Sequence, residues 1–114
     1  MPQITVSELA EWLEQGRDVA VIDVREHAEW IDGHIDRAIH LPMLEATARR
    51  AEVPADRPKA VLCAGGLRSS TAISALKRHG LSNWFNVTGG MTAWKRFGYP
   101  VVRSSSDPAS SPRA

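Results

Sequence analysis

The sequence predicts an α/β domain in which helices cover a mostly parallel sheet. Short apolar runs rich in β-branched residues alternate along the chain with segments of helical periodicity. Parallel neighbours need crossover connections, and helices supply them. The runs at 19–24 and 60–62 are almost continuously apolar, which is typical of strands covered on both faces. We therefore expect three layers, with helices on both sides of the sheet.

Length and composition narrow the class of protein. The 114 residues suffice for one domain with a single core. The net charge is +1 and no run of five or six like charges occurs, so neither nucleic acid nor a membrane surface is indicated as a partner. No stretch approaches the ~20 apolar residues of a membrane span. The single cysteine excludes an intramolecular disulfide, and the first residues lack the features of a secretory signal, so the predicted location is the cytoplasm.

The first half of the chain is predicted to hold three strands and three helices. The strands are a brief one at Ile4, the run 19–24, and a short one at 38–41 that Pro42 closes. One helix follows a capping box at 5–8, and a second covers 26–32 and ends before Gly33. A third covers 44–50, where strong helix formers occur throughout.

The second half repeats the alternation of strand and helix. The strand at 60–62 precedes a helical pattern that Gly80 ends, and a strand at 84–87 precedes a helix at 91–97. From Arg103 onward the chain has serine and proline but no large apolar residue, so this segment cannot offset its ordering entropy. We expect a domain over residues 1–103 and a disordered tail over 104–114.

The chain is organised around residues 59–73, KAVLCAGGLRSSTAI. Cys63 ends the strand, and the hydroxyl cluster 69–71 leads into the next helix. Cys63 therefore faces the N-terminus of that helix. Free N–H groups there, and in a loop that Gly65 and Gly66 allow to curl, form a positive concavity that favours thiolate over thiol. Most lone cysteines simply pack in the core. Packing, however, needs neither the glycine pair nor an arginine five positions on, so we predict a reactive cysteine in an anion cradle.

Charged residues at a neighbouring strand end are candidates to support this loop. Asp23, Arg25 and Glu26 fall at the carboxyl end of the strand 19–24, the edge where open α/β sheets collect functional groups. Arg68 either contacts a bound oxyanion or pairs with Asp23 or Glu26 and braces the loop. Bracing is favoured, because the loop N–H groups already supply contacts to an anion.

The histidines and tryptophans are interpreted as structural. No two histidines share a metal-ligand spacing with the cysteine, so no metal site is predicted. The tryptophans are expected in the core and at helix contacts rather than in a binding stripe. The residues concerned are His27, His34, His40 and His79, and Trp12, Trp30, Trp84 and Trp94.

Three motifs resemble the rhodanese family. The segment CAGGLRS fits the pattern C-x-x-G-x-R-[ST] of the rhodanese active-site loop, and VIDVREHAEWIDGHIDRAIHLP and NVTGGMTAWKRFGYPVV resemble its flanking signatures. Together they cover residues 21–102 in the expected order. The resemblance implies a three-layer α/β/α domain with five strands and the cysteine strand near the middle. The family usually has glycine where this chain has Arg37, so arginine is strained there if the turn needs a positive φ.

The resemblance also implies an activity and a set of site residues. Rhodanese-like proteins are sulfurtransferases that move a sulfane sulfur from thiosulfate or a persulfide to cyanide or a thiol, without a cofactor. The nucleophile is then Cys63, and Asp23, Arg25 and Glu26 support the loop. No resolving cysteine is present, so a persulfide must be discharged by another molecule, and any relay protein is unidentified. The substrate-binding loop comprises Ala64, Gly65, Gly66, Leu67, Arg68 and Ser69.

Two other functions remain open at this stage. Phosphatases and arsenate reductases hold a tetrahedral oxyanion in a C-x5-R loop, but here only four residues separate Cys63 from Arg68, and no general acid is evident. The smaller ring suits a sulfur atom better than a phosphate. The other alternative is a non-catalytic interaction or sulfur-carrier module, against which the intact cysteine argues.

Overall fold

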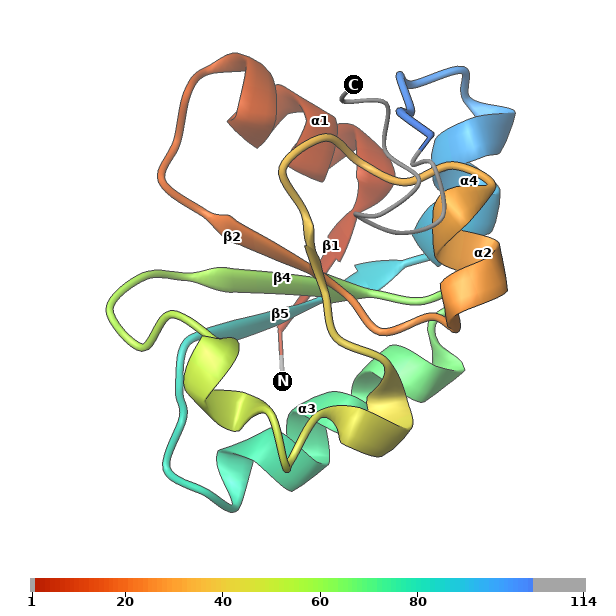
Figure 1. The fold of residues 1–114 in the computed structure, drawn as a ribbon. Helices are drawn as coiled ribbons and strands as arrows, with labels where there is room; N and C mark the ends of the chain where they lie inside the picture. The colour runs from red at the N-terminus through yellow and green to blue at the C-terminus, as the bar shows by residue number, and fades with distance from the viewer. Residues whose placement is uncertain (1, 104–114) are drawn as a thin grey trace, which may run out of the picture.

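Five parallel strands form one sheet in the computed structural model, which describes residues 2–103 (Figure 1). The predicted tail at 104–114 lies outside the described residues. The spatial order is β1-β5-β4-β2-β3 and every pairing is parallel, which confirms the predicted sheet and places β4 in the middle. The strands are β1 (Gln3–Thr5), β2 (Ala20–Asp23), β3 (Ile39–His40), β4 (Lys59–Leu62) and β5 (Trp84–Thr88).

Helices cover both faces of the sheet, so the three-layer prediction is confirmed. Figure 1 shows α3 on one face and α1 and α4 on the other. The helices are α1 (Val6–Glu14), α2 (His27–Ile31), α3 (Leu67–Lys77) and α4 (Gly90–Arg96), with two short 3-10 turns, η1 (Met43–Glu45) and η2 (Arg50–Glu52). No helix in the described part of the chain is long and apolar enough to cross a membrane.

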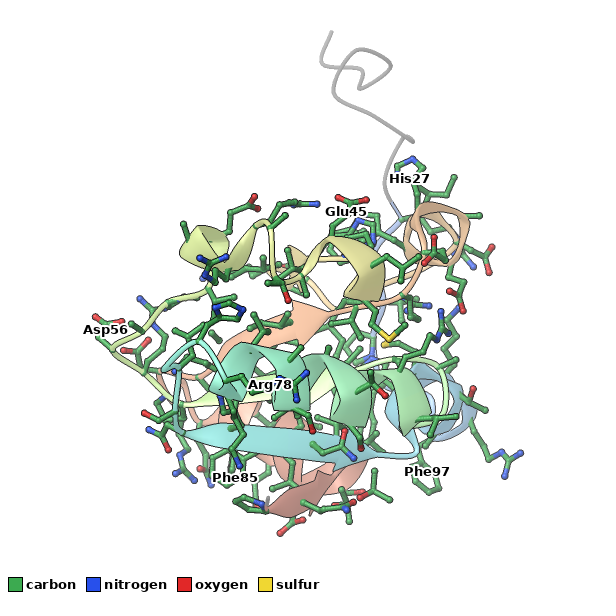
Figure 2. The ribbon with its side chains drawn as sticks, turned by 90° about the horizontal axis from the view of Figure 1, so that it is seen from below. His27, Glu45, Asp56, Arg78, Phe85 and Phe97 are labelled. Carbon is green, nitrogen blue, oxygen red and sulfur yellow. The ribbon has the colours of Figure 1, made fainter. Side chains whose placement is uncertain are left out.

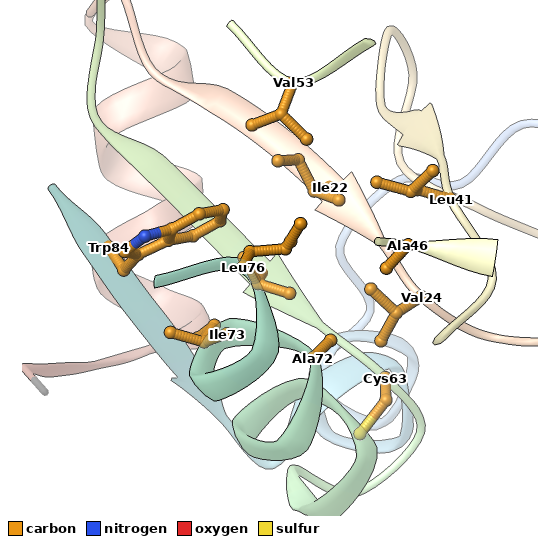
Figure 3. Packing of buried hydrophobic residues seen from close by; sticks show 11 residues of the cluster. Ile22, Val24, Leu41, Ala46, Val53, Cys63, Ala72, Ile73, Leu76 and Trp84 are labelled. Carbon is orange, nitrogen blue, oxygen red and sulfur yellow. The ribbon is translucent and has the colours of Figure 1, made fainter. Parts of the chain in front are cut away.

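Each face of the sheet has its own apolar cluster. On the α3 face, Ile73 and Leu76 pack with Ile22, Val61 and the residues drawn in Figure 3. On the other face, Leu9 of α1 and Trp94 of α4 belong to the second cluster. Strands buried on both sides explain why β2 and β4 appear as continuous apolar runs in the sequence.

The predicted capping box is confirmed at the start of α1. The N–H of Glu8 donates to Thr5 Oγ1 at 3.0 Å, and the N–H of Thr5 donates to Glu8 Oε1 at 2.8 Å. This reciprocal pair satisfies two amides that the first helical turn leaves free. Because the motif is local, the sequence alone was enough to place it.

The predicted helix at 44–50 is wrong. The structure has η1, a series of turns and η2 there, with i to i−3 bonds such as Ala46 N–H to the oxygen of Met43 at 3.2 Å. Ala46 is buried on the α3 face, but Leu44 is 85% exposed. A segment with so little apolar surface to bury gains little from forming a regular helix, whatever its propensity.

The parallel arrangement brings the carboxyl ends of the strands to one edge of the sheet. There β2 leads to α2, β4 leads to the loop of Cys63, and β5 leads to α4. Figure 2 shows His27 and Phe97, which lie at α2 and after α4, on the opposite side of the molecule from Asp56, which precedes β4. The candidate functional residues therefore collect at one end of the domain.

Arg37 adopts the positive φ that its position in the sequence suggested. Its φ is 69°, and the N–H of Ala38 donates to the oxygen of Ile35 at 3.1 Å across the turn. A positive φ confined to the third residue of a turn is typical of type II, which favours glycine there. The chain tolerates arginine at this site at the expense of local strain.

We expect Arg37→Gly to stabilise the protein. A left-handed conformation costs an L residue about 1–2 kcal/mol, and glycine loses about 0.5–1 kcal/mol more backbone entropy, so the free energy of unfolding should rise by about 0.5–1 kcal/mol. Urea unfolding measures this change. Arg37→Ala keeps the strain and is the matched control. Equal stability of the glycine and alanine variants would contradict the explanation.

Candidate active site

Cys63 lies directly after the central strand β4, where its side chain is 1% exposed. Figure 3 shows it at one end of the apolar cluster on the α3 face, close to Ala72 and Val24. Val61 and Cys63 point to the same face because side chains alternate along a strand. The sulfur atom is thus held between the sheet and the first turns of α3.

The loop after Cys63 turns its backbone toward the sulfur. Gly66 has φ 113°, and its N–H donates to Cys63 Sγ at 2.9 Å. α3 begins at Leu67 with Gly66 as its N-cap. The hydroxyl cluster 69–71 therefore lies inside the helix, whereas the sequence had suggested that it precedes the helix. This earlier start brings Ser69 next to the sulfur.

Ser69 is fully buried and has three polar neighbours. Its Oγ lies 3.6 Å from Cys63 Sγ, 3.0 Å from the oxygen of Gly66 and 2.5 Å from Asn86 Oδ1. Asn86 comes from β5 and is 3% exposed. No local pattern in the sequence indicates this contact, because Asn86 is 17 residues from Ser69.

The environment lowers the pKa of Cys63 below its ordinary value. Burial raises the pKa, but hydrogen bonds from the Ser69 hydroxyl and from the N–H groups of Ser69, Gly66 and Gly65 lower it and prevail. Donors aimed at the anion favour the charged form. The site can therefore present a thiolate, which is the nucleophilic form of cysteine.

The start of α4 holds the other side of the loop. The N–H of Met91 donates to the oxygen of Cys63 at 2.8 Å, and the N–H of Thr92 donates to the oxygen of Ala64 at 3.0 Å. Gly90 permits this approach, since a Cβ there would lie 2.2 Å from the oxygen of Cys63. In the sequence, the pair Gly89-Gly90 between β5 and the body of α4 is the signal from which this close contact could have been found.

Arg68 is braced by Glu29, so the predicted partner, Asp23 or Glu26, was wrong. Arg68 Nη1 and Nη2 donate to Glu29 Oε1 and Oε2, both at 2.8 Å. The hydrogen bond from Arg68 lowers the pKa of Glu29 to about 2, and the same bond raises the pKa of Arg68. Glu29 lies one turn beyond Glu26, the N-cap of α2, and the packing of α2 beside α3 places its carboxylate against Arg68.

The three predicted supporting residues form contacts of their own beside the loop. Arg25 donates to Asp23 through Nε and Nη2 at 2.8 to 3.1 Å, and Nη2 also donates to the oxygen of Gly33 at 2.8 Å. The N–H of Glu26 donates to Glu29 Oε1 at 2.9 Å. These bonds hold the segment that leads into α2, next to Glu29.

Two histidines hold Trp30 of α2 between them. The Trp30 ring stacks on His34 with centroids 3.5 Å apart and on His40 with centroids 4.6 Å apart. His34 Nδ1 lies 2.8 Å from the oxygen of Trp30, and His40 Nε2 lies 2.8 Å from the oxygen of Arg25. Both histidines therefore have the structural role that was predicted. Within residues 2–103, no three His, Cys, Asp or Glu side chains come together as a metal site requires.

Comparison with known families identifies the domain. A family model described as a rhodanese-like domain matches residues 5–97. The chain belongs to the rhodanese-like domain family. This result confirms the resemblance drawn from the three motifs, and the matched residues include the cysteine loop described above.

Individual rhodanese-like relatives carry sulfurtransferase names. The chain is 39% identical over 95 residues to a probable adenylyltransferase/sulfurtransferase, MoeZ, of Mycobacterium tuberculosis, with 82% of this chain and 24% of MoeZ covered. It thus spans about a quarter of the length of that relative. It is 36% identical over 100 residues to a sulfurtransferase of Allochromatium vinosum, with 88% and 94% covered.

Solved rhodanese-like structures share the fold. A rhodanese-related protein from Thermoplasma volcanium superimposes with a TM-score of 0.80 at 36% identity, covering 90% of this chain and 98% of that one. A rhodanese-like domain protein from Staphylococcus aureus gives a TM-score of 0.82 at 30% identity, with 91% and 99% covered. The predicted five-stranded rhodanese-like architecture is therefore confirmed.

Gly90→Ala should destabilise the rhodanese-like domain severely. The new Cβ would collide with the oxygen of Cys63, and alanine would be strained at φ 51°, so we expect a loss of more than about 3 kcal/mol in the free energy of unfolding. Gly98→Ala is the matched control, since Gly98 has φ 77° but nothing within 4 Å of a Cβ. It should cost only about 1 kcal/mol. Similar losses in urea unfolding would refute the close-contact argument.

Glu29→Gln should weaken the domain in a pH-dependent way. The folded pKa of Glu29 is about 2, below the ordinary 4.5, so ionisation contributes stability that is present above pH 4.5 and disappears as the pH falls toward 2. Because the pair is about one third exposed, we expect the variant to lose about 1 kcal/mol at pH 7.

Urea unfolding between pH 7 and pH 2 tests this expectation. The stability curves of the wild type and Glu29→Gln should converge at the acid end. Glu45→Gln, which removes one carboxylate from the more exposed pair with Arg49, is the control and should change stability less. A constant difference at every pH would show that the carboxylate charge is not responsible.

Proposed function

We propose that this protein is a sulfurtransferase that carries sulfur on Cys63 as a persulfide. The observation that carries the proposal is the short hydrogen bond from the N–H of Gly66 to Cys63 Sγ at 2.9 Å, in a loop whose donors lower the pKa of the thiol. A structural cysteine has no need of such donors, whereas a thiolate nucleophile does.

The first half-reaction loads the sulfur. The Cys63 thiolate attacks the outer, sulfane sulfur of thiosulfate, a new S–S bond forms, and the bond between that sulfur and the sulfonate sulfur breaks. Its electron pair leaves with sulfite, so charge and atoms balance. The resulting persulfide anion is stabilised by the loop N–H groups, which remain in place as the negative charge moves one atom outward.

The second half-reaction unloads the sulfur. Cyanide or a thiolate attacks the outer sulfur of the Cys63 persulfide, and the Cys63 thiolate is regenerated as the leaving group. The products are thiocyanate or a persulfide on the acceptor. Since the chain contains no second cysteine, the acceptor belongs to another molecule, and the kinetics should be of the double-displacement type.

A role in sulfur relay fits the same chemistry. Another relative, 28% identical over 94 residues, is a putative sulfur carrier protein, YrkF, of Bacillus subtilis, of which the match covers 51%. We propose a protein or small-molecule thiol in the cytoplasm as the natural acceptor. In this proposal the loop Ala64–Ser69 binds the donor, and Arg68 acts mainly as a brace because Glu29 occupies both of its terminal nitrogens.

The loop geometry argues against phosphate chemistry. A phosphatase arginine uses its guanidinium to hold the oxyanion, whereas the guanidinium of Arg68 is bound to Glu29. The ring between Cys63 and Arg68 also has only four intervening residues. Aryl phosphate hydrolysis should therefore be negligible compared with sulfur transfer.

The decisive experiment is the intact mass of the reduced protein after treatment with thiosulfate. We expect the mass to increase by one sulfur atom and to return to its original value after cyanide is added. Cys63→Ser should never gain this mass, because its hydroxyl stays protonated and cannot attack sulfur, while the nearly isosteric change should preserve the fold.

One further variant and two further substrates sharpen this test. Arg68→Ala should lower the melting temperature if Arg68 is a brace, and should raise the KM for thiosulfate at unchanged stability if Arg68 binds the donor. A folded wild-type protein that gains sulfur neither from thiosulfate nor from an alkyl persulfide would favour the non-catalytic interaction module. Cys63-dependent phosphatase turnover comparable to sulfur transfer would favour the phosphatase.

A further inference from the structure

The contacts of Asn86 with Ser69 suggest a role that the proposed reaction does not yet use. Asn86 lies opposite Val61 in the β4–β5 pairing, so its side chain and that of Cys63 share the α3 face of the sheet. Its Oδ1 lies 2.5 Å from Ser69 Oγ, which in turn lies 3.6 Å from Cys63 Sγ. All three residues are at most 3% exposed, so water does not compete for these bonds.

The Ser69 hydroxyl has more acceptors around it than protons to give. A hydroxyl carries one proton, yet Ser69 Oγ faces Gly66 O at 3.0 Å, Asn86 Oδ1 at 2.5 Å and Cys63 Sγ at 3.6 Å. Gly66 O can only accept, and a thiolate can only accept. The direction of the Ser69 proton therefore depends on which group donates to Ser69 Oγ.

Asn86 is the neighbour that can change from acceptor to donor. With a neutral thiol, Cys63 S–H donates to Ser69 Oγ and Ser69 donates to Asn86 Oδ1. When the thiol ionises, sulfur loses its proton and becomes an acceptor. A half-turn of the Asn86 amide then presents its NH2 group to Ser69 Oγ, and the hydroxyl proton is free to turn to sulfur.

We propose that Asn86 is a positioning residue whose side-chain amide, by a half-turn, directs the single hydroxyl proton of Ser69 either away from Cys63 or onto its thiolate. This inference refines the proposed sulfurtransferase mechanism. It gives β5 a part in preparing the nucleophile, although no residue of β5 touches the sulfur in the hydrogen bonds of the described chain.

Few charged groups compete with this effect. Arg68 of α3 is the cation that interacts with the thiolate, and Glu29 of α2 neutralises it. The sequence of β5, WFNVT, contains no titratable residue. Asp23 of β2 and Arg25 form a buried ion pair with each other, and Glu26 is exposed at the N-cap of α2. The other charged residues on the surrounding elements lie at their far ends or on exposed positions: Lys59 of β4, Lys77 of α3, Lys95 and Arg96 of α4, and Glu45 of η1.

The rate of Cys63 alkylation by iodoacetamide as a function of pH tests the proposal. Asn86→Ala leaves Ser69 to donate to Gly66 O, so we expect the midpoint of the alkylation profile to rise by about one pH unit, the usual scale of one hydrogen bond to a charged group. Asn86→Asp, which only accepts, should raise the midpoint further. Asn83→Asp makes the same charge change at an exposed turn and should leave the midpoint unchanged.

A double-mutant cycle separates action through Ser69 from a general disturbance of the site. Ser69→Ala should raise the midpoint by itself, and adding Asn86→Ala to it should cause no further rise. A midpoint that stays at the wild-type value in Asn86→Ala, or two shifts that simply add, would overturn the proposal. Alkylation needs no sulfur donor, so this result is independent of whether the protein accepts sulfur from thiosulfate.

The wild-type protein allows a second test that no folding defect can obscure. Nuclear Overhauser contacts between the Asn86 side-chain NH2 and the Ser69 Hβ protons should be weak below the Cys63 midpoint and strong above it, because the amide reverses. Contacts of equal strength on both sides of the midpoint would show that the amide does not turn and would overturn the proposal.

Discussion

The close approach of α4 to the backbone of Cys63 is the constraint on which the rest of the site depends. Only glycine at position 90 fits against the oxygen of Cys63, and this fit lets the first amides of α4 bind the carbonyl oxygens of Cys63 and Ala64. With those oxygens held by α4, the loop turns the N–H of Gly66 toward sulfur. The loop is polarised as a result: two carbonyl oxygens face α4, and an amide donor faces the thiolate.

The parallel sheet brings the other parts of the site to this loop. Because all five strands run in the same direction, the ends of β2, β4 and β5 meet at one edge, and each contributes one part of the site. β4 supplies Cys63, β5 supplies Asn86 and leads into α4, and β2 leads into α2 with Glu29. The ion pair between Glu29 and Arg68 joins residues 39 positions apart, so it connects α2 to α3 beside the loop that follows Cys63.

The sequence predicted what local patterns control and failed where distant packing decides. The capping box, the buried strands and the position of Cys63 at the end of a strand depend on adjacent residues, and each was placed correctly. Arg68 was expected to be braced, but its partner Glu29 is determined by the way α2 packs beside α3. The sequence shows which carboxylates are available and does not show how the two helices pack. Asn86 was missed for the same reason. At 44–50, high helix propensity was overruled because the segment has too little apolar surface to bury.

The groups that stabilise the Cys63 thiolate determine which residues can alter the reactivity of the thiol. Glu29 neutralises Arg68, so the lowered pKa of Cys63 depends mainly on dipoles, those of the loop amides and the Ser69 hydroxyl. Fixed dipoles in a buried site are screened by salt far less than a surface charge is. Backbone amides are also the same whatever side chain is present, whereas Ser69 has the one side chain within the described residues that hydrogen-bonds to the sulfur. Among the groups that hydrogen-bond to the sulfur, Ser69 is therefore the one whose side chain a substitution can change, and Asn86 is the nearest group that competes for its proton.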